Sequence, residues 1–124
     1  TYSLNDQNEL TWQARATTDA PTIINLVHHT YWNLTGDPAR SILDHELRLE
    51  ADHFLPTDAG LIPSGEQRSV AGTALDFRSM RRIGERIEEE EEALHLAGGY
   101  DHCWILRECE GLRVAAVLAD PSSG

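Results

Sequence analysis

The chain has 124 residues, of which 40% are hydrophobic and 25% are charged, so it is long enough to bury a core and has an ordinary globular composition. Its formal net charge of −11 argues against binding to nucleic acid or to an anionic membrane surface, because both require positive potential on the protein. No apolar run approaches the length that is needed to cross a membrane.

Alternating apolar and polar side chains predict β-strands in the first half of the chain. Residues 10–16 alternate in this way and predict a half-buried strand. After a turn at residues 19–21, residues 25–33 form an aromatic-rich run that we expect to be a strand ending before Gly36. The clearest alternation covers residues 43–53. On one face of that segment we expect Leu43, His45, Leu47, Leu49, Ala51 and His53.

The second half of the chain contains more turn signals and one helical pattern. Residues 56–65, with two prolines and two glycines, predict a structured loop, and residues 72–78 predict a short irregular connection. The apolar residues Ile83, Ile87 and Leu94 predict one short helix, with a solvated acidic run at residues 88–92 and an end at Gly98–Gly99. Residues 103–106 and 112–118 predict a hairpin around Glu110–Gly111.

Short strands at regular spacing, separated by turns, predict an all-β fold of the sandwich or barrel type. The chain begins directly in a strand and stops in a loop, so we expect residues 1–124 to be a single partial domain, the central portion of a longer protein. A sheet cut in this way has open edges, and open edges predict self-association.

The two cysteines, Cys103 and Cys109, flank a predicted strand and turn. A disulfide between them and a pair of free thiols both fit this spacing. Free thiols in a reducing compartment are favoured, and a cytoplasmic location is therefore expected.

Two adjacent histidines lie inside the aromatic-rich run and are the first candidates for chemistry. Because successive side chains of a strand point to opposite faces, His29 and Tyr31 share one face and His28 points to the other. An imidazole beside a phenol suits a polar pocket floor, and histidine exchanges its proton near neutral pH. The alternative for His29 is a histidine that is simply hydrogen-bonded within a sheet. A zinc site is disfavoured, because adjacent residues of a strand diverge.

A second candidate is Asp101, which follows a double glycine and precedes an apolar run. A carboxylate at the end of a strand can accept hydrogen bonds from two sugar hydroxyls. The alternative is a turn in which Asp101 caps its own backbone. The aromatic residues Trp12, Trp32, Tyr100 and Trp104 fit either stacking on a sugar ring or core packing, and core packing is favoured.

Four motifs in the same order resemble the aldose 1-epimerase (mutarotase) family. Residues 28–36 match its Asn-His-Ser-Tyr-Phe-Asn-Leu-x-Gly strand, residues 62–66 its Ile-Pro-Thr-Gly-Glu loop, residues 73–78 its Thr-Pro-Phe-Asp-Phe-Arg segment, and residues 99–106 its Gly-Tyr-Asp-His-Asn-Phe-Val-Leu segment. Together these motifs extend over most of the chain. His28 departs from the pattern, since the family usually has asparagine there.

The resemblance implies a large galactose-mutarotase-like β-sandwich with one short helix, and a small aldose sugar as the partner. It implies that His29 is the general acid that protonates the ring oxygen and that Asp101 binds sugar hydroxyls. His28 and Tyr31, beside the acid, are the further expected substrate contacts. No metal or organic cofactor is implied.

The family's catalytic base is a glutamate far toward the C-terminus, and no glutamate of this chain lies in a matching motif. We therefore expect a parent protein that interconverts the α and β anomers of galactose, glucose or a similar aldose, while the isolated chain is inactive. One alternative is a non-catalytic carbohydrate-binding or structural β-domain. A second is a hexose-6-phosphate epimerase, which needs converging arginines and is disfavoured by the acidic charge balance.

Overall fold

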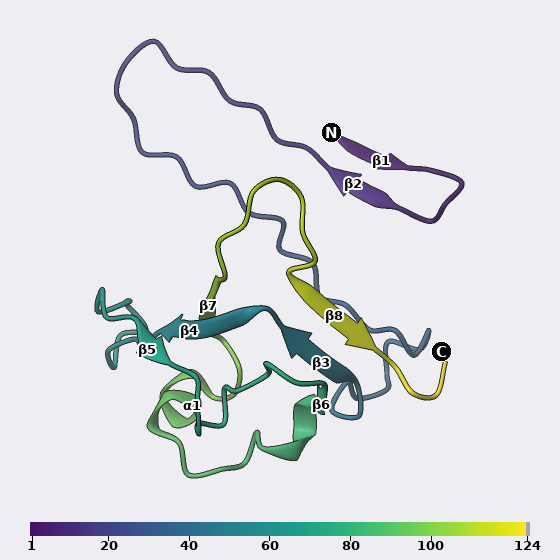
Figure 1. The fold of residues 1–124 in the computed structure, drawn as a ribbon, viewed down its shortest axis with the longest axis vertical. Coiled ribbons are helices and arrows are strands. Elements are labelled where there is room, and N and C mark those ends of the chain that lie inside the picture. The colour runs from purple at the N-terminus through teal and green to yellow at the C-terminus, as the bar shows by residue number, and fades with distance from the viewer. Residues whose placement is uncertain (124) are drawn as a thin grey trace. The chain divides into compact units, whose positions relative to one another are not determined.

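The computed structural model describes residues 1–123, and the chain divides into two compact units, Thr1–Trp32 and the residues from Asn33 onward. Its regular structure is mostly β-strand with one short α-helix, as predicted (Figure 1). In chain order the elements are β1 (Tyr2–Leu4), β2 (Leu10–Trp12), β3 (Glu46–Leu49), β4 (Ala51–Leu55), β5 (Arg68–Ser69), β6 (Arg81–Arg82), the 3-10 helix η1 (Ile83–Glu85), α1 (Glu92–Ala97), β7 (Cys103–Leu106) and β8 (Ala116–Ala119).

The first unit contains one antiparallel hairpin, in which β1 pairs with β2. Its turn is stabilised by Asn5, whose Oδ1 accepts hydrogen bonds from the backbone N–H groups of Gln7 (3.1 Å) and Glu9 (2.9 Å). The predicted strand over residues 10–16 is therefore confirmed only for its first part, Leu10–Trp12.

The predicted strand over residues 25–33 is not formed, and that prediction is wrong for this chain. Figure 1 draws a long connection without strands between β2 and β3. A strand is defined by hydrogen bonds to a neighbour, and no strand among residues 1–123 pairs with this segment. Its apolar side chains are exposed as a result, with Val27 at 68% and Tyr31 at 88% of full exposure.

The second unit contains two three-stranded antiparallel sheets, with the orders β6-β3-β8 and β5-β4-β7. The predicted alternating segment supplies both central strands, β3 and β4, and the chain passes from one sheet to the other at Glu50. The Glu50 N–H donates to the Ala115 carbonyl and the Glu50 carbonyl accepts from the Arg107 N–H, both at 2.9 Å. One continuous strand over residues 43–53 is therefore a wrong prediction, since this residue ties the two sheets together.

A register shift between Ala51 and His53 also changes which side chains face the core. Ala51 is buried as predicted, but His53 is exposed and the next residue, Phe54, is fully buried. An irregularity of this kind reverses the inward and outward positions that follow it. The predicted face thus ends at Ala51.

The predicted hairpin between residues 103–106 and 112–118 is also wrong. β7 pairs with β4, whereas β8 pairs with β3 in the other sheet. Each strand pairs with a central strand that is far away in the sequence, so residues 107–115 connect two sheets rather than closing a tight turn.

The one predicted short helix is present as α1, but it does not include Ile83 and Ile87. Ile83 belongs to the separate 3-10 helix η1 instead. The acidic residues 88–90 between them are exposed, as expected for a run of like charges that opposes a continuous helix. Arg86 holds this connection, because it donates to the Thr73 carbonyl (2.6 Å) and pairs with Glu89. Helix α1 ends at Gly98, as predicted, in the left-handed conformation that glycine adopts easily (φ 68°).

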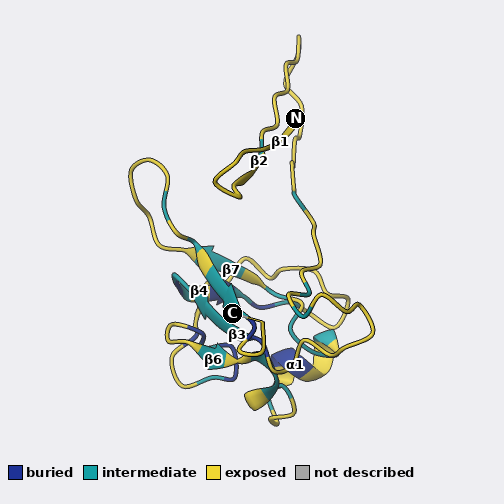
Figure 2. Ribbon diagram, turned by 90° about the vertical axis from the view of Figure 1, so that its right-hand side faces the viewer, coloured by how far each residue is buried: buried dark blue, intermediate teal, exposed yellow. Residues whose placement is uncertain are grey.

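The core of the second unit lies where β4, the connection over residues 70–77 and α1 meet. Figure 2 colours buried residues dark blue on β4 and α1. The buried cluster consists of Phe54, Val70, Leu75 and Ala93, with Tyr100 and Trp104 packed against it.

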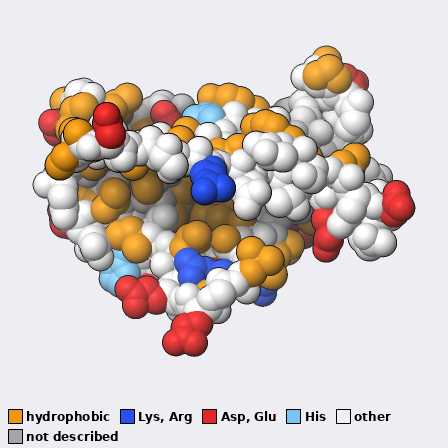
Figure 3. Space-filling view, turned by 90° about the horizontal axis from the view of Figure 1, so that it is seen from above, with side chains coloured by type: hydrophobic (Ala, Val, Ile, Leu, Met, Phe, Trp, Pro, Cys, Tyr) orange, Lys and Arg blue, Asp and Glu red, His pale blue; other side chains and the backbone are white. Residues whose placement is uncertain are grey.

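Much apolar surface remains exposed, and Figure 3 shows hydrophobic side chains open to solvent on the face that it draws. Cys103 and Cys109 are free thiols and both are exposed. Among the described residues, none of the helices has the length and apolar character of a membrane span. Self-association through the open sheet edges stays a prediction.

Candidate functional site

His29 lies in the long connection of the first unit, and its side chain is exposed. Its ring centroid is 5.0 Å from that of Tyr31, with a tilt of 37° between the ring planes. The two side chains therefore lie on the same side of the backbone, as the alternation predicts, although no strand forms there. The imidazole of His29 is open to a ligand.

His28 has different surroundings, because its ring packs against the β1-β2 hairpin. It stacks on Trp12 at a centroid distance of 5.7 Å and meets Tyr2 edge-on at 5.5 Å. Its Nε2 also shares a 2.6 Å hydrogen bond with the hydroxyl of Thr30. The two adjacent histidines are thus separated, His28 held by aromatic packing and His29 facing solvent.

Asp101 belongs to the second unit and lies between α1 and β7. The preceding Gly99 has φ 134°, a conformation that other residues rarely adopt, so this double-glycine turn directs the chain into β7. Asp101 is exposed, and among residues 1–123 its carboxylate accepts no hydrogen bond. The self-capping turn is therefore not formed, and both carboxylate oxygens are free to accept hydrogen bonds from hydroxyl groups.

Tyr100 and Trp104, on either side of Asp101, are held by the connection over residues 72–78. The Tyr100 hydroxyl donates to the Ala74 carbonyl (3.0 Å), and the Trp104 Nε1–H donates to the Leu75 carbonyl (3.1 Å). Burial raises the pKa of the Tyr100 hydroxyl above its ordinary value. The favoured prediction of core packing is confirmed for these two aromatic residues, and they place Asp101 between two anchored neighbours. The same prediction is wrong for Trp32, which is 52% exposed.

His102 follows Asp101 and points into the core. Its ring meets Phe54 edge-on at a centroid distance of 5.8 Å and Trp104 at 6.0 Å. Burial lowers the pKa of the His102 imidazole below its ordinary value, because the protonated ring loses hydration. The His102 ring therefore contributes to core packing, and its protonation opposes folding.

We expect the stability of the protein to fall as the pH drops below the ordinary histidine pKa of about 6.5. Below this pH the unfolded chain binds a proton at His102 more readily than the folded chain does, which favours unfolding. The free energy of unfolding stops falling once the pH is below the pKa that His102 has in the folded chain. Urea unfolding of the full-length protein at about pH 7.5 and 5.5 measures the difference. His102→Phe, which keeps an aromatic ring, should reduce this pH dependence; an unchanged slope contradicts the assignment.

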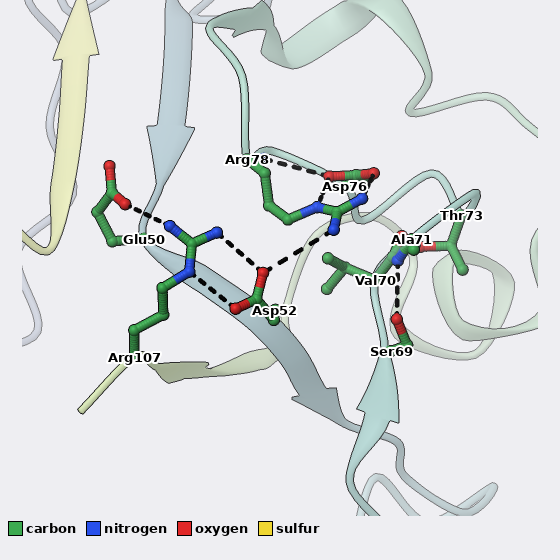
Figure 4. Close-up of polar contacts among 9 residues, drawn as sticks. All are labelled: Glu50, Asp52, Ser69, Val70, Ala71, Thr73, Asp76, Arg78 and Arg107. Atoms are coloured by element: carbon green, nitrogen blue, oxygen red, sulfur yellow. Dashed lines mark hydrogen bonds and ion pairs between the residues drawn. The ribbon is translucent and has the colours of Figure 1, made fainter.

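A network of charged side chains surrounds the start of β4 (Figure 4). Arg107 donates two 2.8 Å hydrogen bonds to the Asp52 carboxylate and one of 2.7 Å to Glu50. Arg78 pairs with Asp76 at 2.7 Å and lies 3.9 Å from Asp52. Hydrogen bonds from Arg107 lower the pKa of Asp52, and hydrogen bonds from Arg78 lower the pKa of Asp76.

The arginines of this unit are thus largely engaged by carboxylates of the same chain. Three further arginines also pair with carboxylates: Arg81 with Glu85, Arg82 with Asp44, and Arg86 with Glu89. A phosphate site requires arginines that converge on the ligand and are free to donate to it. That a sugar phosphate is disfavoured as the substrate stays a prediction.

The loop over residues 56–65 is a structured connector, as predicted. Asp58 Oδ1 accepts hydrogen bonds from the N–H groups of Gly60 (2.8 Å) and Ile62 (3.1 Å), and Thr57 forms a β-bridge with Pro63. These contacts hold the loop closed on itself.

Of the predicted site residues, the structure brings His29 and Tyr31 together and gives His28 separate packing partners. Sequence reasoning missed Arg107 as the partner of Asp52, because the two residues are 55 positions apart. It also treated His45 only as one member of an alternating face, although this histidine is fully buried. No local signal identifies either contact.

The whole chain, residues 1–124, matches the family model of aldose 1-epimerase. Over 123 residues it is 40% identical to galactose mutarotase from Bos taurus. This alignment covers 99% of this chain and 34% of that protein. It is 38% identical over 116 residues to aldose 1-epimerase from Escherichia coli (strain K12), covering 93% of this chain and 33% of that protein. The chain thus spans about a third of the length of these relatives.

Solved structures agree with this match. Galactose 1-epimerase from Lactobacillus acidophilus NCFM aligns with a TM-score of 0.56 at 37% sequence identity, over 63% of this chain and 23% of that chain. A GalM/aldose epimerase homologue from C. elegans aligns with a TM-score of 0.61 at 31% identity, over 76% of this chain and 27% of that chain. On the match of the family model over its entire length, the chain belongs to the aldose 1-epimerase family.

Proposed function

We propose that the full-length protein is a mutarotase, which interconverts the α and β anomers of galactose, glucose or a similar aldose. The observation that carries this proposal is the exposed imidazole of His29, with Tyr31 beside it, inside a chain that matches the family throughout. The adjacent His28 is packed against Trp12, which leaves His29 as the better placed proton donor.

The reaction opens and recloses a hemiacetal ring, and it needs two proton transfers. A base takes the proton from the anomeric hydroxyl while an acid protonates the ring oxygen, and the C1–O5 bond breaks. Rotation about C1–C2 followed by the reverse transfers yields the other anomer. We propose that His29 is the acid, because an imidazole donates and recovers a proton reversibly near neutral pH.

The remaining proposed roles concern substrate binding. Asp101 accepts hydrogen bonds from sugar hydroxyls, a role supported by its exposed carboxylate without partners among residues 1–123. Tyr31, at 88% exposure, and His28 are the proposed contacts beside the acid. We propose that the base is a glutamate outside residues 1–124, so that the isolated chain binds sugar weakly and does not turn it over.

Polarimetry on freshly dissolved α-D-galactose and α-D-glucose tests the proposal. The full-length protein should accelerate the approach to anomeric equilibrium well above the rate in buffer, and NMR of the anomeric protons should report the same rate. Residues 1–124 alone, at equal concentration, should leave the buffer rate unchanged. A full-length protein that binds these sugars without accelerating the reaction contradicts the mutarotase proposal and favours a non-catalytic sugar-binding domain.

We also propose a cytoplasmic location. The free, exposed thiols of Cys103 and Cys109 support it, because exposed thiols persist in a reducing compartment.

A further inference from the structure

His45, the residue directly before β3, is fully buried and holds another part of the chain with its ring. Its Nε2 accepts a hydrogen bond from the backbone N–H of Leu34 at 2.9 Å. The backbone of His45 is itself fixed on both sides. Its N–H donates to the Ile42 carbonyl (3.0 Å), and its carbonyl accepts from the Ile83 N–H (2.9 Å). The imidazole is therefore a rigidly mounted acceptor.

The carbonyl of Leu34 is held from a second direction. It accepts a 3.0 Å hydrogen bond from the hydroxyl of Ser123. Ser123 lies in the turn after β8, where the Ser123 N–H donates to the Asp120 carbonyl (3.2 Å) and the Ser122 hydroxyl donates to the Asp120 carboxylate (2.8 Å). Since β3 and β8 are paired neighbours, the ends of two adjacent strands hold both polar groups of Leu34.

The preceding residue, Asn33, is anchored as well. Its Nδ2 donates to the carbonyls of Arg40 (3.0 Å) and Asp37 (3.2 Å), and its Oδ1 accepts from the Thr35 N–H (3.1 Å). Asn33 and Leu34 belong to the same motif as His29 and follow it by only a few positions. The C-terminal end of that motif is therefore clamped, whereas the segment that carries His29 has no strand partner among residues 1–123.

We propose that His45 is a positioning residue for the reaction, because its ring fixes the backbone of Leu34, which lies at the end of the motif that carries His29. The proposal rests on the proposed function, in which His29 is the acid. Catalytic groups must be held to within a fraction of an ångström, and a displacement of about 1 Å costs on the order of 100-fold in rate. His45 acts on the acid through the backbone of Leu34 and touches no substrate.

The hydrogen bond from Leu34 fixes the tautomer of His45. To accept from the Leu34 N–H, Nε2 must be unprotonated, so the ring proton resides on Nδ1, a buried atom without a partner among the described residues. The charged groups that line the cavity of about 110 Å³ beside the ring are Arg40, Asp44, Arg82 and Asp120.

Two substitutions at His45 in the full-length protein test this role. His45→Leu removes the acceptor and should lower kcat for anomer interconversion by about 10- to 100-fold with little change in KM. His45→Gln offers Oε1 as an acceptor at a similar reach and should restore most of the lost kcat. His53→Leu, at an exposed histidine of β4, is the matched control and should leave kcat unchanged.

Thermal unfolding of each variant ensures that only folded protein is compared. If His45→Leu does not fold, Ser123→Ala tests the positioning role instead. It removes the hydrogen bond that the exposed Ser123 side chain donates to the Leu34 carbonyl, and it should still lower kcat several-fold. Full activity in folded His45→Leu or in Ser123→Ala overturns the positioning role, as does a His45→Gln variant no better than His45→Leu. A wild-type protein without mutarotase activity is a different failure, since it overturns the proposed function itself.

Discussion

Replacing His29 with alanine in the full-length protein is expected to lower kcat for anomer interconversion by about 10²- to 10⁴-fold, the usual contribution of a positioned general acid. Without the imidazole, the ring oxygen must take its proton from water as the C1–O5 bond breaks. The loss should appear mainly in kcat, because His29 acts on the transition state and hydroxyl binding is assigned to Asp101. Polarimetry with galactose at several concentrations separates kcat from KM.

The adjacent His28→Ala variant is the matched comparison for this prediction. The His28 ring packs on Trp12 and Tyr2 and bonds to Thr30, so its removal should affect sugar affinity and local packing more than proton transfer. We expect its kcat to stay within about tenfold of the wild type, below the loss of a general acid. A fully active His29→Ala variant, or a larger kcat loss in His28→Ala, would show that the roles of the two histidines are misassigned.

Replacing Phe54 with alanine should lower the free energy of unfolding by about 3–5 kcal/mol, the cost of emptying the space of a buried phenylalanine. Phe54 is fully buried in β4 and belongs to the cluster with Val70, Leu75 and Ala93. Its backbone pairs with Trp104 in β7, so the cavity would open beside two strands at once. Urea or thermal denaturation of the full-length protein measures the change.

Phe54→Leu is the control that separates lost volume from a specific role of the ring. Leucine fills part of the space, so the loss should be much smaller, about 1–2 kcal/mol. The ring of Phe54 also meets His102 edge-on at a centroid distance of 5.8 Å, which adds to the cost of both substitutions. A loss below about 1 kcal/mol for Phe54→Ala would mean that this residue lies outside the main core.

Local features of this chain were predictable because their causes lie within a few residues. Gly98 ends α1 where the double glycine indicates, since glycine adopts φ 68° without the strain that most other residues incur there. The loop over residues 56–65 closes through hydrogen bonds of its own Asp58. The opposite orientations of His28 and His29 follow from backbone alternation, which persists even without a strand partner.

Long-range pairing was not predictable in the same way. Residues 103–106 and 112–118 carry the pattern of a hairpin, yet each strand pairs with a distant central strand, because burial against β3 and β4 outweighs proximity in the sequence. The register shift after Ala51 exposes His53 and buries Phe54. The alternation of apolar and polar residues in the sequence continues through this point and does not indicate the shift. The strand expected at residues 25–33 lacks a partner, and no sequence pattern of its own can supply one.

The amino-acid sequence by itself determined the family motifs, the all-β character and the candidates His29 and Asp101, since these depend on residue identity and short-range spacing. Only the tertiary structure decided which candidates are exposed and what holds them. It separated His28 from His29 by packing, left the Asp101 carboxylate open, and buried His45 against the Leu34 backbone. The physical reason is that burial and hydrogen bonding join residues far apart in the chain, and the spacing of a motif does not encode its distant partners.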